Sequence, residues 1–184
     1  MGVLGDSLNR AEENTATRPI PKSAGAKMRF LVRRLKGTRA LAELLGISQR
    51  TVERYVKDQL KQPRPELAAR LDSEVRARWQ PRVRDRAKKR AATATGIVVE
   101  TRARFGFTAA PGSTDDGRIR LITQHLPPEY AARLFDAQSD GATDRQLQAV
   151  VAEGLQEIYF KDQGRRAEGL SVEFTDIDYV ELDF

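Results

Sequence analysis

Small and hydrophobic residues between Thr38 and Lys57 recur at the spacing of two short helices joined by a tight turn. Ala42 is small where the helices would approach most closely, and Val52 would be buried between them. Gly46 can adopt the left-handed backbone that ends a first helix, and Ser48 is a suitable N-cap for a second. The remaining apolar positions of this predicted core are Leu41, Leu45, Ile47 and Tyr55. The pattern therefore predicts a helix-turn-helix.

Helical patterns flank this segment on both sides. Residues 27–36 place their apolar side chains on one face, which predicts a preceding helix. Pro65 suits the first turn of a later helix, in which apolar residues recur at every fourth position up to Trp79. Pro81 should kink or break that helix. The predicted parts are a mobile arm over residues 1–25, with a short helix near Leu4 to Leu8, and a helical module over residues 26–94.

From residue 95 onward the pattern changes to an alternation with a period of two, which is typical of strands. The predicted elements are strands at 95–108 and 118–126, helices at 129–137 and 144–160, and a strand at 170–184. Thr143 can cap the second helix. The alternation of the last strand slips near Thr175, which indicates a bulge or a turn. We therefore predict an α+β fold: an N-terminal all-α helix-turn-helix module followed by a β-β-α-α-β acidic domain over residues 95–184.

The net charge of +6 conceals an opposition between the two halves of the chain. Residues 1–90 hold 23 Lys and Arg against 10 Asp and Glu, a net of +13, whereas residues 91–184 hold 9 against 16, a net of −7. A cationic module suits a polyanion such as DNA. In a major groove, Arg50 and Arg54 could read guanine, and Gln49 could read adenine. The predicted DNA contacts are Arg39, Gln49, Arg50, Thr51, Arg54, Lys57, Arg82, Arg84, Arg86, Lys88, Lys89 and Arg90.

The sequence contains no recognisable catalytic motif. It has no cysteine and one histidine, so disulfides, zinc fingers and paired-histidine metal sites are excluded. We expect that histidine, His125, to be structural, and we expect neither a secretory signal nor a membrane segment. The segment 109–117 (AAPGSTDDG) carries Ser113 and Thr114 between flexible glycines. Taken alone, this composition is that of an ordinary hairpin loop.

Long strings in the chain resemble telomere terminal proteins of Streptomyces-type linear chromosomes and plasmids. The strings are LAELLGISQRTVERYV, WQPRVRDRAKKRAATATGIVVETRARFGF and STDDGRIR, and the resemblance extends over essentially the whole chain. It implies a protein that is covalently attached to the 5′ ends of linear DNA and serves as a protein primer for end-patching DNA synthesis. The resemblance implies that the priming hydroxyl, to which the DNA is joined, is that of Thr114.

The resemblance also implies partners and a location. The protein would be a nucleotide acceptor and not an enzyme. Its partners would be telomeric DNA, a telomere-associated DNA-binding protein and a DNA polymerase, with no membrane partner. It would need no intrinsic cofactor, because the polymerase supplies the divalent metal that activates the hydroxyl. The expected location is cytoplasmic, at chromosome ends in the nucleoid.

Other interpretations of the same residues remain open. A helix-turn-helix transcriptional regulator would use its C-terminal half for dimerisation or effector binding and would leave no covalent product. A nicking relaxase would form a tyrosine ester, but a single histidine and no metal triad argue against it. Within the priming interpretation, Ser113 is a rival acceptor. Asp115 and Asp116 could imitate primer phosphates or help to hold the catalytic metals.

Overall fold

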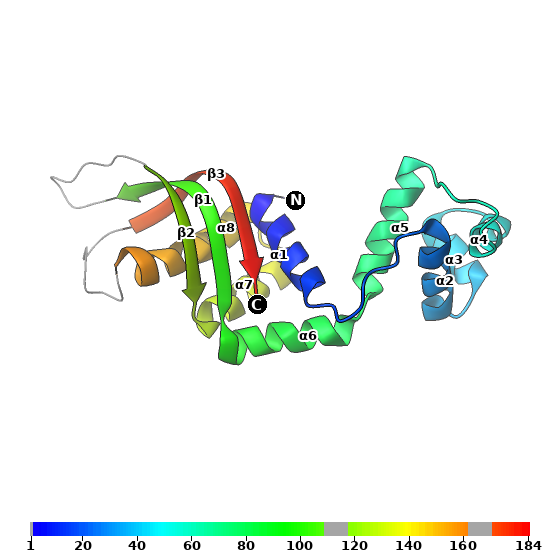
Figure 1. Ribbon diagram of the computed structural model, residues 1–184, viewed down its shortest axis with the longest axis horizontal. Helices are drawn as coiled ribbons and strands as arrows, with labels where there is room; N and C mark the ends of the chain where they lie inside the picture. The colour runs from blue at the N-terminus through cyan, green and yellow to red at the C-terminus, as the bar shows by residue number, and fades with distance from the viewer. Residues whose placement is uncertain (1, 109–117, 162–170) are drawn as a thin grey trace. The chain divides into compact units, whose positions relative to one another are not determined.

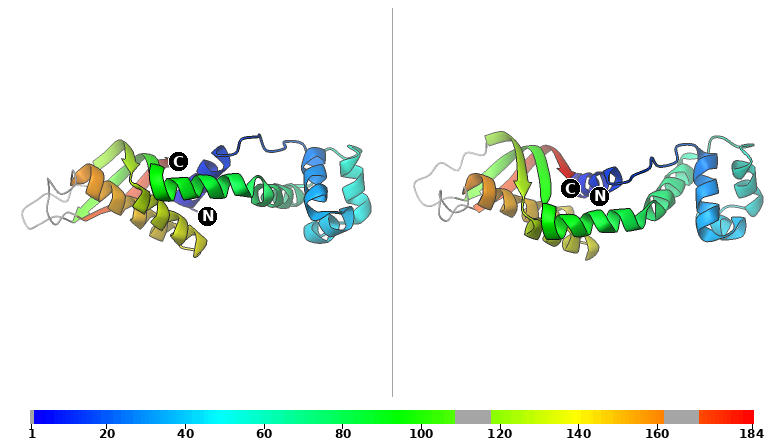
Figure 2. Two further views of the ribbon diagram at one scale, coloured as in Figure 1. Left: turned by 90° about the horizontal axis from the view of Figure 1, so that it is seen from below. Right: turned by 60° about the horizontal axis from the view of Figure 1, so that its bottom comes forward.

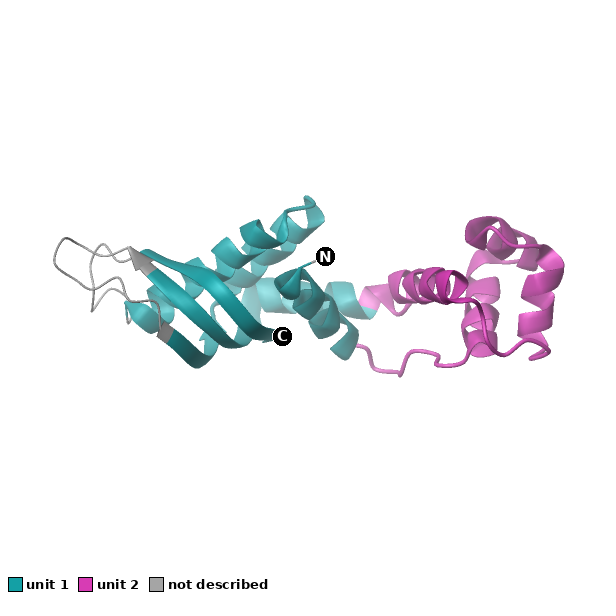
Figure 3. Ribbon diagram, turned by 90° about the horizontal axis from the view of Figure 1, so that it is seen from above, with its two compact units in different colours: residues 1–15, 83–184 teal, residues 16–82 magenta. Residues whose placement is uncertain are grey.

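The computed structural model describes residues 2–108, 118–161 and 171–184. The chain forms two compact units, drawn in separate colours in Figure 3. Unit 1 comprises residues 1–15 and 83–184, and unit 2 comprises residues 16–82. In the sequence, unit 2 is therefore inserted between the first helix of unit 1 and the rest of that unit.

The first helix, α1 (Val3–Asn14), corrects the prediction of a mobile arm over residues 1–25. Leu4, Leu8 and Ala11 recur at helical spacing, and each is at most 1% exposed in the core of unit 1. These side chains bury apolar surface against strands and helices that come much later in the sequence. The predicted arm is wrong for this reason: the partners that order α1 are not its sequence neighbours.

Unit 2 consists of helices packed around one apolar core. Its helices are α2 (Ala24–Leu35), α3 (Thr38–Leu45), α4 (Gln49–Val56) and α5 (Pro65–Arg78), as Figure 1 shows. Gly46 ends α3 with a left-handed φ of 65°, and its amide donates to the carbonyls of Ala42 and Glu43. The Ser48 hydroxyl accepts from the Thr51 amide at 3.2 Å and caps α4. The two short helices and the turn predicted from the sequence are therefore present.

The helical path breaks between α5 and α6 (Pro81–Arg90), as the proline predicted. Trp79 has an extended backbone at the break, and its indole donates to the Arg18 carbonyl at 3.0 Å. Helix α6 begins in unit 2, and unit 1 resumes within it at Val83. The boundary that we predicted between residues 94 and 95 therefore lies too late in the sequence.

Unit 1 is built on an antiparallel sheet with the strand order β2-β1-β3. Its strands are β1 (Ile97–Thr108), β2 (Arg118–Leu126) and β3 (Ser171–Asp183). Its helices are α1, most of α6, α7 (Pro128–Ser139) and α8 (Asp144–Leu155), with π-helical turns at Ala91–Thr95 and Gln156–Phe160. Helices α7 and α8 lie on one side of the sheet and α1 lies along β3 (Figure 1 and Figure 2). The chain is accordingly α+β, as predicted at the level of fold class.

The two faces of the sheet differ in burial. The helix-covered face holds Val99 and Phe105, which are fully buried. No described element packs on the other face, where Ile119 and Leu121 are 51% and 68% exposed. The alternation predicts that Ile119 and Leu121 share a side of β2, and they do. That side faces away from the core, which Ile122 enters instead.

Strand β3 is irregular where the sequence predicted a slip. Arg104 pairs with Asp176 and Phe105 pairs with Phe174, so that Thr175 is the extra residue of a bulge. The slip predicted near Thr175 is therefore confirmed as a bulge. A second irregularity follows, because Ala103 pairs with Ile177 and Arg102 pairs with Tyr179, which leaves Asp178 as another extra residue.

Candidate nucleic-acid interface and priming segment

Polar side chains at the start of α4 already form hydrogen bonds. The Gln49 amide donates to the Thr38 hydroxyl at 3.1 Å and to the Glu53 carboxylate at 3.0 Å. The hydroxyls of Ser48 and Thr51 share a hydrogen bond of 2.8 Å. All of these bonds are exposed to solvent. A bidentate contact of Gln49 with adenine would therefore require its amide nitrogen to exchange one of these bonds for a bond to the base.

The two arginines of α4 are exposed and available for contact with a ligand. Arg50 and Arg54 are exposed, and within the described residues neither guanidinium forms a hydrogen bond or an ion pair. Arg39 pairs with Glu43 at 3.1 Å, but their side chains are 84% and 69% exposed, so this pair is weak and easily exchanged for a phosphate. Lys57 is exposed at the end of α4. The exposed surface of α4 thus carries cations with little internal compensation.

The basic run of α6 divides into two groups by burial. Four of its cations, Arg82, Arg86, Lys89 and Arg90, are exposed to solvent. The side chains of Arg84 and Lys88 are only 18% and 24% exposed. The charge pattern of the sequence predicts all six as DNA contacts, but only four of them are exposed in the structure.

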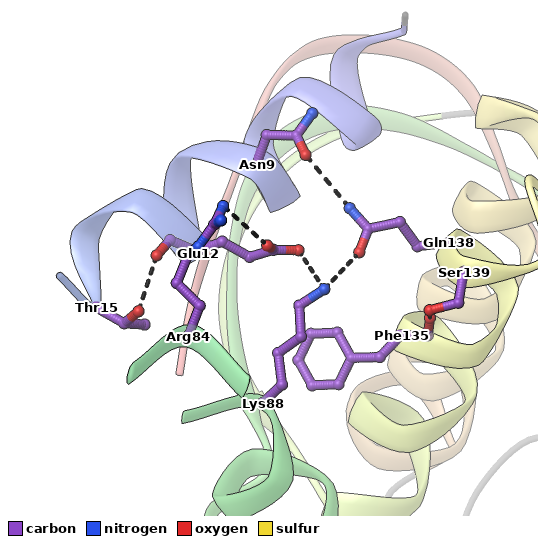
Figure 4. A network of polar contacts seen from close by, with 8 residues as sticks. All are labelled: Asn9, Glu12, Thr15, Arg84, Lys88, Phe135, Gln138 and Ser139. Atoms are coloured by element: carbon purple, nitrogen blue, oxygen red, sulfur yellow. Dashed lines mark hydrogen bonds and ion pairs between the residues drawn. The ribbon is translucent and has the colours of Figure 1, made fainter. Parts of the chain in front are cut away.

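Arg84 and Lys88 face the Glu12 carboxylate of α1 (Figure 4). The Lys88 ammonium lies 2.5 Å from one Glu12 oxygen, and the Arg84 guanidinium lies 3.9 Å from the other. Lys88 also donates to the Gln138 side chain at 3.0 Å, and its ammonium lies 5.3 Å from the centre of the Phe135 ring. These contacts join α6 to α1 and α7. The two cations therefore contribute to the packing of unit 1, which makes them less available to DNA than the exposed cations of α6.

The sequence contained a signal for this division. Arg84 and Lys88 lie seven and three residues before Ala91, on the same face of a helix, and Ala91 is fully buried. Arg86 and Lys89 lie elsewhere on the helix. Glu12, the acidic partner of these two cations, could not be identified from the sequence, because its helix was not predicted as part of the core.

The proposed acceptor hydroxyls lie outside the described residues. Thr114, Ser113, Asp115 and Asp116 all belong to the segment 109–117, which follows β1 and precedes β2. In the antiparallel register of these strands Phe105 lies opposite Arg118, so the two ends of the segment are attached to neighbouring strands. The fully buried ring of Phe105 packs against those of Phe160 and Phe174, with centroids 5.4 and 4.9 Å away. The strands that carry the segment are thus anchored in the core.

Two tyrosines of unit 1 are poor nucleophiles at neutral pH. Burial, with the nearby carboxylates of Glu153 and Glu157, raises the pKa of Tyr130. Desolvation and the Glu100 carboxylate, which accepts its hydrogen bond at 3.2 Å, raise the pKa of Tyr179. A raised pKa keeps a phenol protonated, which disfavours the tyrosine ester of a nicking enzyme.

Other site chemistry is sparse in the part of the chain that the structure describes. His125 is exposed, and its ring nitrogen lies within hydrogen-bonding distance of the Thr95 carbonyl. No three His, Cys, Asp or Glu side chains of the described ranges gather as a metal site would require. Among those ranges, no helix combines the length and the apolar character needed to span a membrane.

Comparisons of this chain with protein-family models, with curated proteins and with solved structures find no match.

Proposed function

We propose that this chain is a telomere terminal protein, joined through the Thr114 hydroxyl to the 5′ ends of linear DNA and acting there as a protein primer. In this proposal unit 2 is a helix-turn-helix module that binds terminal DNA, and unit 1 is the priming domain. The resemblance of three long sequence strings is the starting point for the proposal. The distribution of charge between the two halves of the chain agrees with it.

On DNA, α4 would occupy the major groove. Arg50 and Arg54 would reach base edges, because each is exposed and free of competing contacts within the described residues. The exposed cations of α6, Arg86 and Lys89 among them, would contact phosphates and supply affinity without sequence choice.

In priming, the Thr114 oxygen attacks the α-phosphorus of a nucleoside triphosphate. A new P–O bond forms, pyrophosphate leaves, and the hydroxyl proton passes to solvent. Metal ions held by the polymerase lower the pKa of the hydroxyl and stabilise the charge that develops. The chain itself has to deliver one hydroxyl into a recessed site of another protein.

One observation carries the proposal in the structure. The segment that contains Thr114 joins two antiparallel strands whose register keeps Phe105 opposite Arg118, on a sheet anchored by buried aromatic rings. The strands on either side of the segment are therefore part of a rigid scaffold, which is the setting from which proteins commonly present functional connections to a partner.

The test is to isolate terminal DNA without protease, digest the DNA, and analyse the polypeptide by mass spectrometry. We expect one nucleotide bonded through phosphate to Thr114. A transcriptional regulator would carry none, and a nicking enzyme would carry a tyrosine ester. Attachment to Ser113 would keep the function and change the acceptor.

A further inference from the structure

The open face of the unit 1 sheet is arranged in stripes of distinct chemistry. The stripe on β2 begins with the exposed aliphatic residues Ile119 and Leu121 and continues with the exposed polar residues Thr123 and His125. The stripe on β1 includes the exposed cations Arg102 and Arg104. The stripe on β3 is acidic and exposed, and its residues are Glu173, Asp176, Asp178, Glu181 and Asp183.

Most of this acidic stripe has no ion-pair partner among the residues that the structure describes. Arg102 pairs with Asp178 at 3.2 Å. Glu173, Asp176 and Glu181 form no ion pair within the described residues. In the strand order β2-β1-β3 the two arginines of β1 lie between this acidic row and the aliphatic side chains of β2. The exposed carboxylates outnumber these arginines, which is unfavourable for nucleic acid because like charges repel. The surface is complementary to a cationic protein surface with an apolar flank.

We propose that this open face, defined by the outward residues of β1, β2 and β3, is the docking surface for the cationic, nucleic-acid-holding channel of the DNA polymerase. The inference rests on the proposed priming function. A polymerase channel is cationic because it holds a polyanionic primer and template. A protein primer needs an anionic surface to occupy such a channel. Strands β1 and β2 of the face are those whose ends join the Thr114 segment, so docking there would bring the acceptor toward the polymerase.

In this proposal the two units bind different partners. The cationic unit 2 holds DNA, which the acidic sheet face repels. The sheet face holds the polymerase, which also binds DNA. Long-range attraction between unlike charges accelerates encounter and falls with ionic strength, whereas the contact of Leu121 with an apolar flank does not depend on salt.

The experiment measures nucleotide labelling of the full chain by each purified DNA polymerase of the host, with Mg²⁺ and a labelled nucleoside triphosphate. The test variant is Glu173→Gln/Asp176→Asn/Glu181→Gln. The matched control, Glu129→Gln/Asp136→Asn/Asp140→Asn, removes three exposed carboxylates from α7 and its end, and so changes the net charge by the same amount. A third variant, Leu121→Ser, removes the most exposed aliphatic side chain of the face.

We expect the sheet variant to raise the half-saturating concentration of the chain by about tenfold at low salt, with the rate at saturation unchanged. The α7 control should match the parent, and Leu121→Ser should raise the half-saturating concentration at all salt concentrations. Circular dichroism should show that all variants remain folded, because every altered side chain is exposed.

Three outcomes would overturn the inference. If the parent is labelled and the sheet variant has the same half-saturating concentration, the docking surface is wrong and the priming function stands. If sedimentation shows that the parent dimerises and the sheet variant does not, the face belongs to a second copy of the chain. If no polymerase labels the parent, the priming function itself fails, and the docking surface fails with it.

Discussion

The Ser7 hydroxyl accepts a hydrogen bond from the buried backbone amide of Leu182 at 2.9 Å, across 175 residues of sequence. Ser7 lies in α1, and Leu182 lies near the end of the edge strand β3. Without this acceptor the amide would lack a partner at a buried sheet edge, which is costly. Helix α1 therefore satisfies a backbone amide at the edge of the sheet. It does so although the whole of unit 2 separates α1 from the rest of unit 1 in the sequence.

The first prediction concerns the packing of α1. Leu8→Ala should lower the free energy of unfolding of unit 1 by about 2–5 kcal/mol, because the side chain is fully buried and its removal leaves a cavity. Val3→Ala in the same helix should cost far less, since Val3 is 43% exposed. Urea unfolding followed by circular dichroism measures both. Equal losses for the two variants would contradict the packing of α1.

The second prediction separates structural cations from DNA-binding cations on α6. Lys88→Met should cost about 3 kcal/mol of stability, because it removes a cation from a largely buried pair with Glu12. Lys89→Met should leave stability unchanged and weaken DNA binding, because Lys89 is exposed. Thermal unfolding and fluorescence anisotropy with a DNA duplex give the two readouts. The division of α6 fails if the two variants are indistinguishable in both.

The third prediction concerns base reading by α4. Arg50→Ala or Arg54→Ala should lose about 1–3 kcal/mol of binding to terminal DNA and reduce the preference for it over a scrambled duplex. Arg86→Ala should weaken binding to both duplexes equally. It should also reduce the slope of the logarithm of the binding constant against the logarithm of the salt concentration by about one. Titrations at several salt concentrations test this. Equal weakening on both duplexes by the α4 variants would assign them to phosphate contact.

The fourth prediction identifies the acceptor. Thr114→Val should abolish nucleotide attachment, because valine has a similar shape and no hydroxyl. Ser113→Ala should be labelled like the parent. The measurement is incorporation of labelled nucleotide, and a labelled Thr114→Val variant would remove this residue as the acceptor. Unchanged labelling of an Asp115→Asn/Asp116→Asn variant would likewise show that these carboxylates do not assist priming.

The fifth prediction is a pH dependence of stability. The Glu153 carboxylate accepts two hydrogen bonds from the Arg133 guanidinium, at 2.8 and 2.6 Å, and this lowers the pKa of Glu153 from its ordinary value of 4.5. The contribution is present above that value and is lost as pH falls through the lowered pKa of the folded state. Both side chains are nearly half exposed, so it amounts to about 0.5 kcal/mol.

Glu153→Gln tests the pH dependence. The variant should be slightly less stable than the parent at neutral pH, and the difference should shrink as the pH falls below the ordinary value of 4.5 and through the lowered pKa of the folded state. Urea unfolding at a series of pH values measures this difference. A gap that stays constant across the series would show that the carboxylate charge does not contribute.

Features that depend on a few neighbouring residues were predictable. Gly46 ends α3 in the left-handed conformation, and Ser48 caps α4, because each acts on backbone groups within four residues. Thr143 caps α8 as expected, and Gln146 reciprocates in a capping box. In each case the residue and the group that it satisfies lie in the same turn.

Features that depend on distant partners were not predictable in the same way. Alternation placed Ile119 and Leu121 on one side of β2, but the choice of the side that faces the core depends on where α7 and α8 pack. The sequence showed that α6 is basic, but it did not show which of its cations are buried. Lys88 pairs with Glu12, which precedes unit 2 in the sequence, whereas Lys88 follows it.

The sequence by itself determined the helical pair around Gly46, the strand and helix order of the second half, the opposed charges and the presence of a hydroxyl-bearing segment between two strands. Only the tertiary structure decided that α1 belongs to unit 1, which cations of α6 remain exposed, and which face of the sheet is open. The physical reason is the separation in sequence between the residues that interact. Backbone conformation and caps are set within a turn, whereas burial and charge neutralisation are set by whichever residues the fold brings into contact.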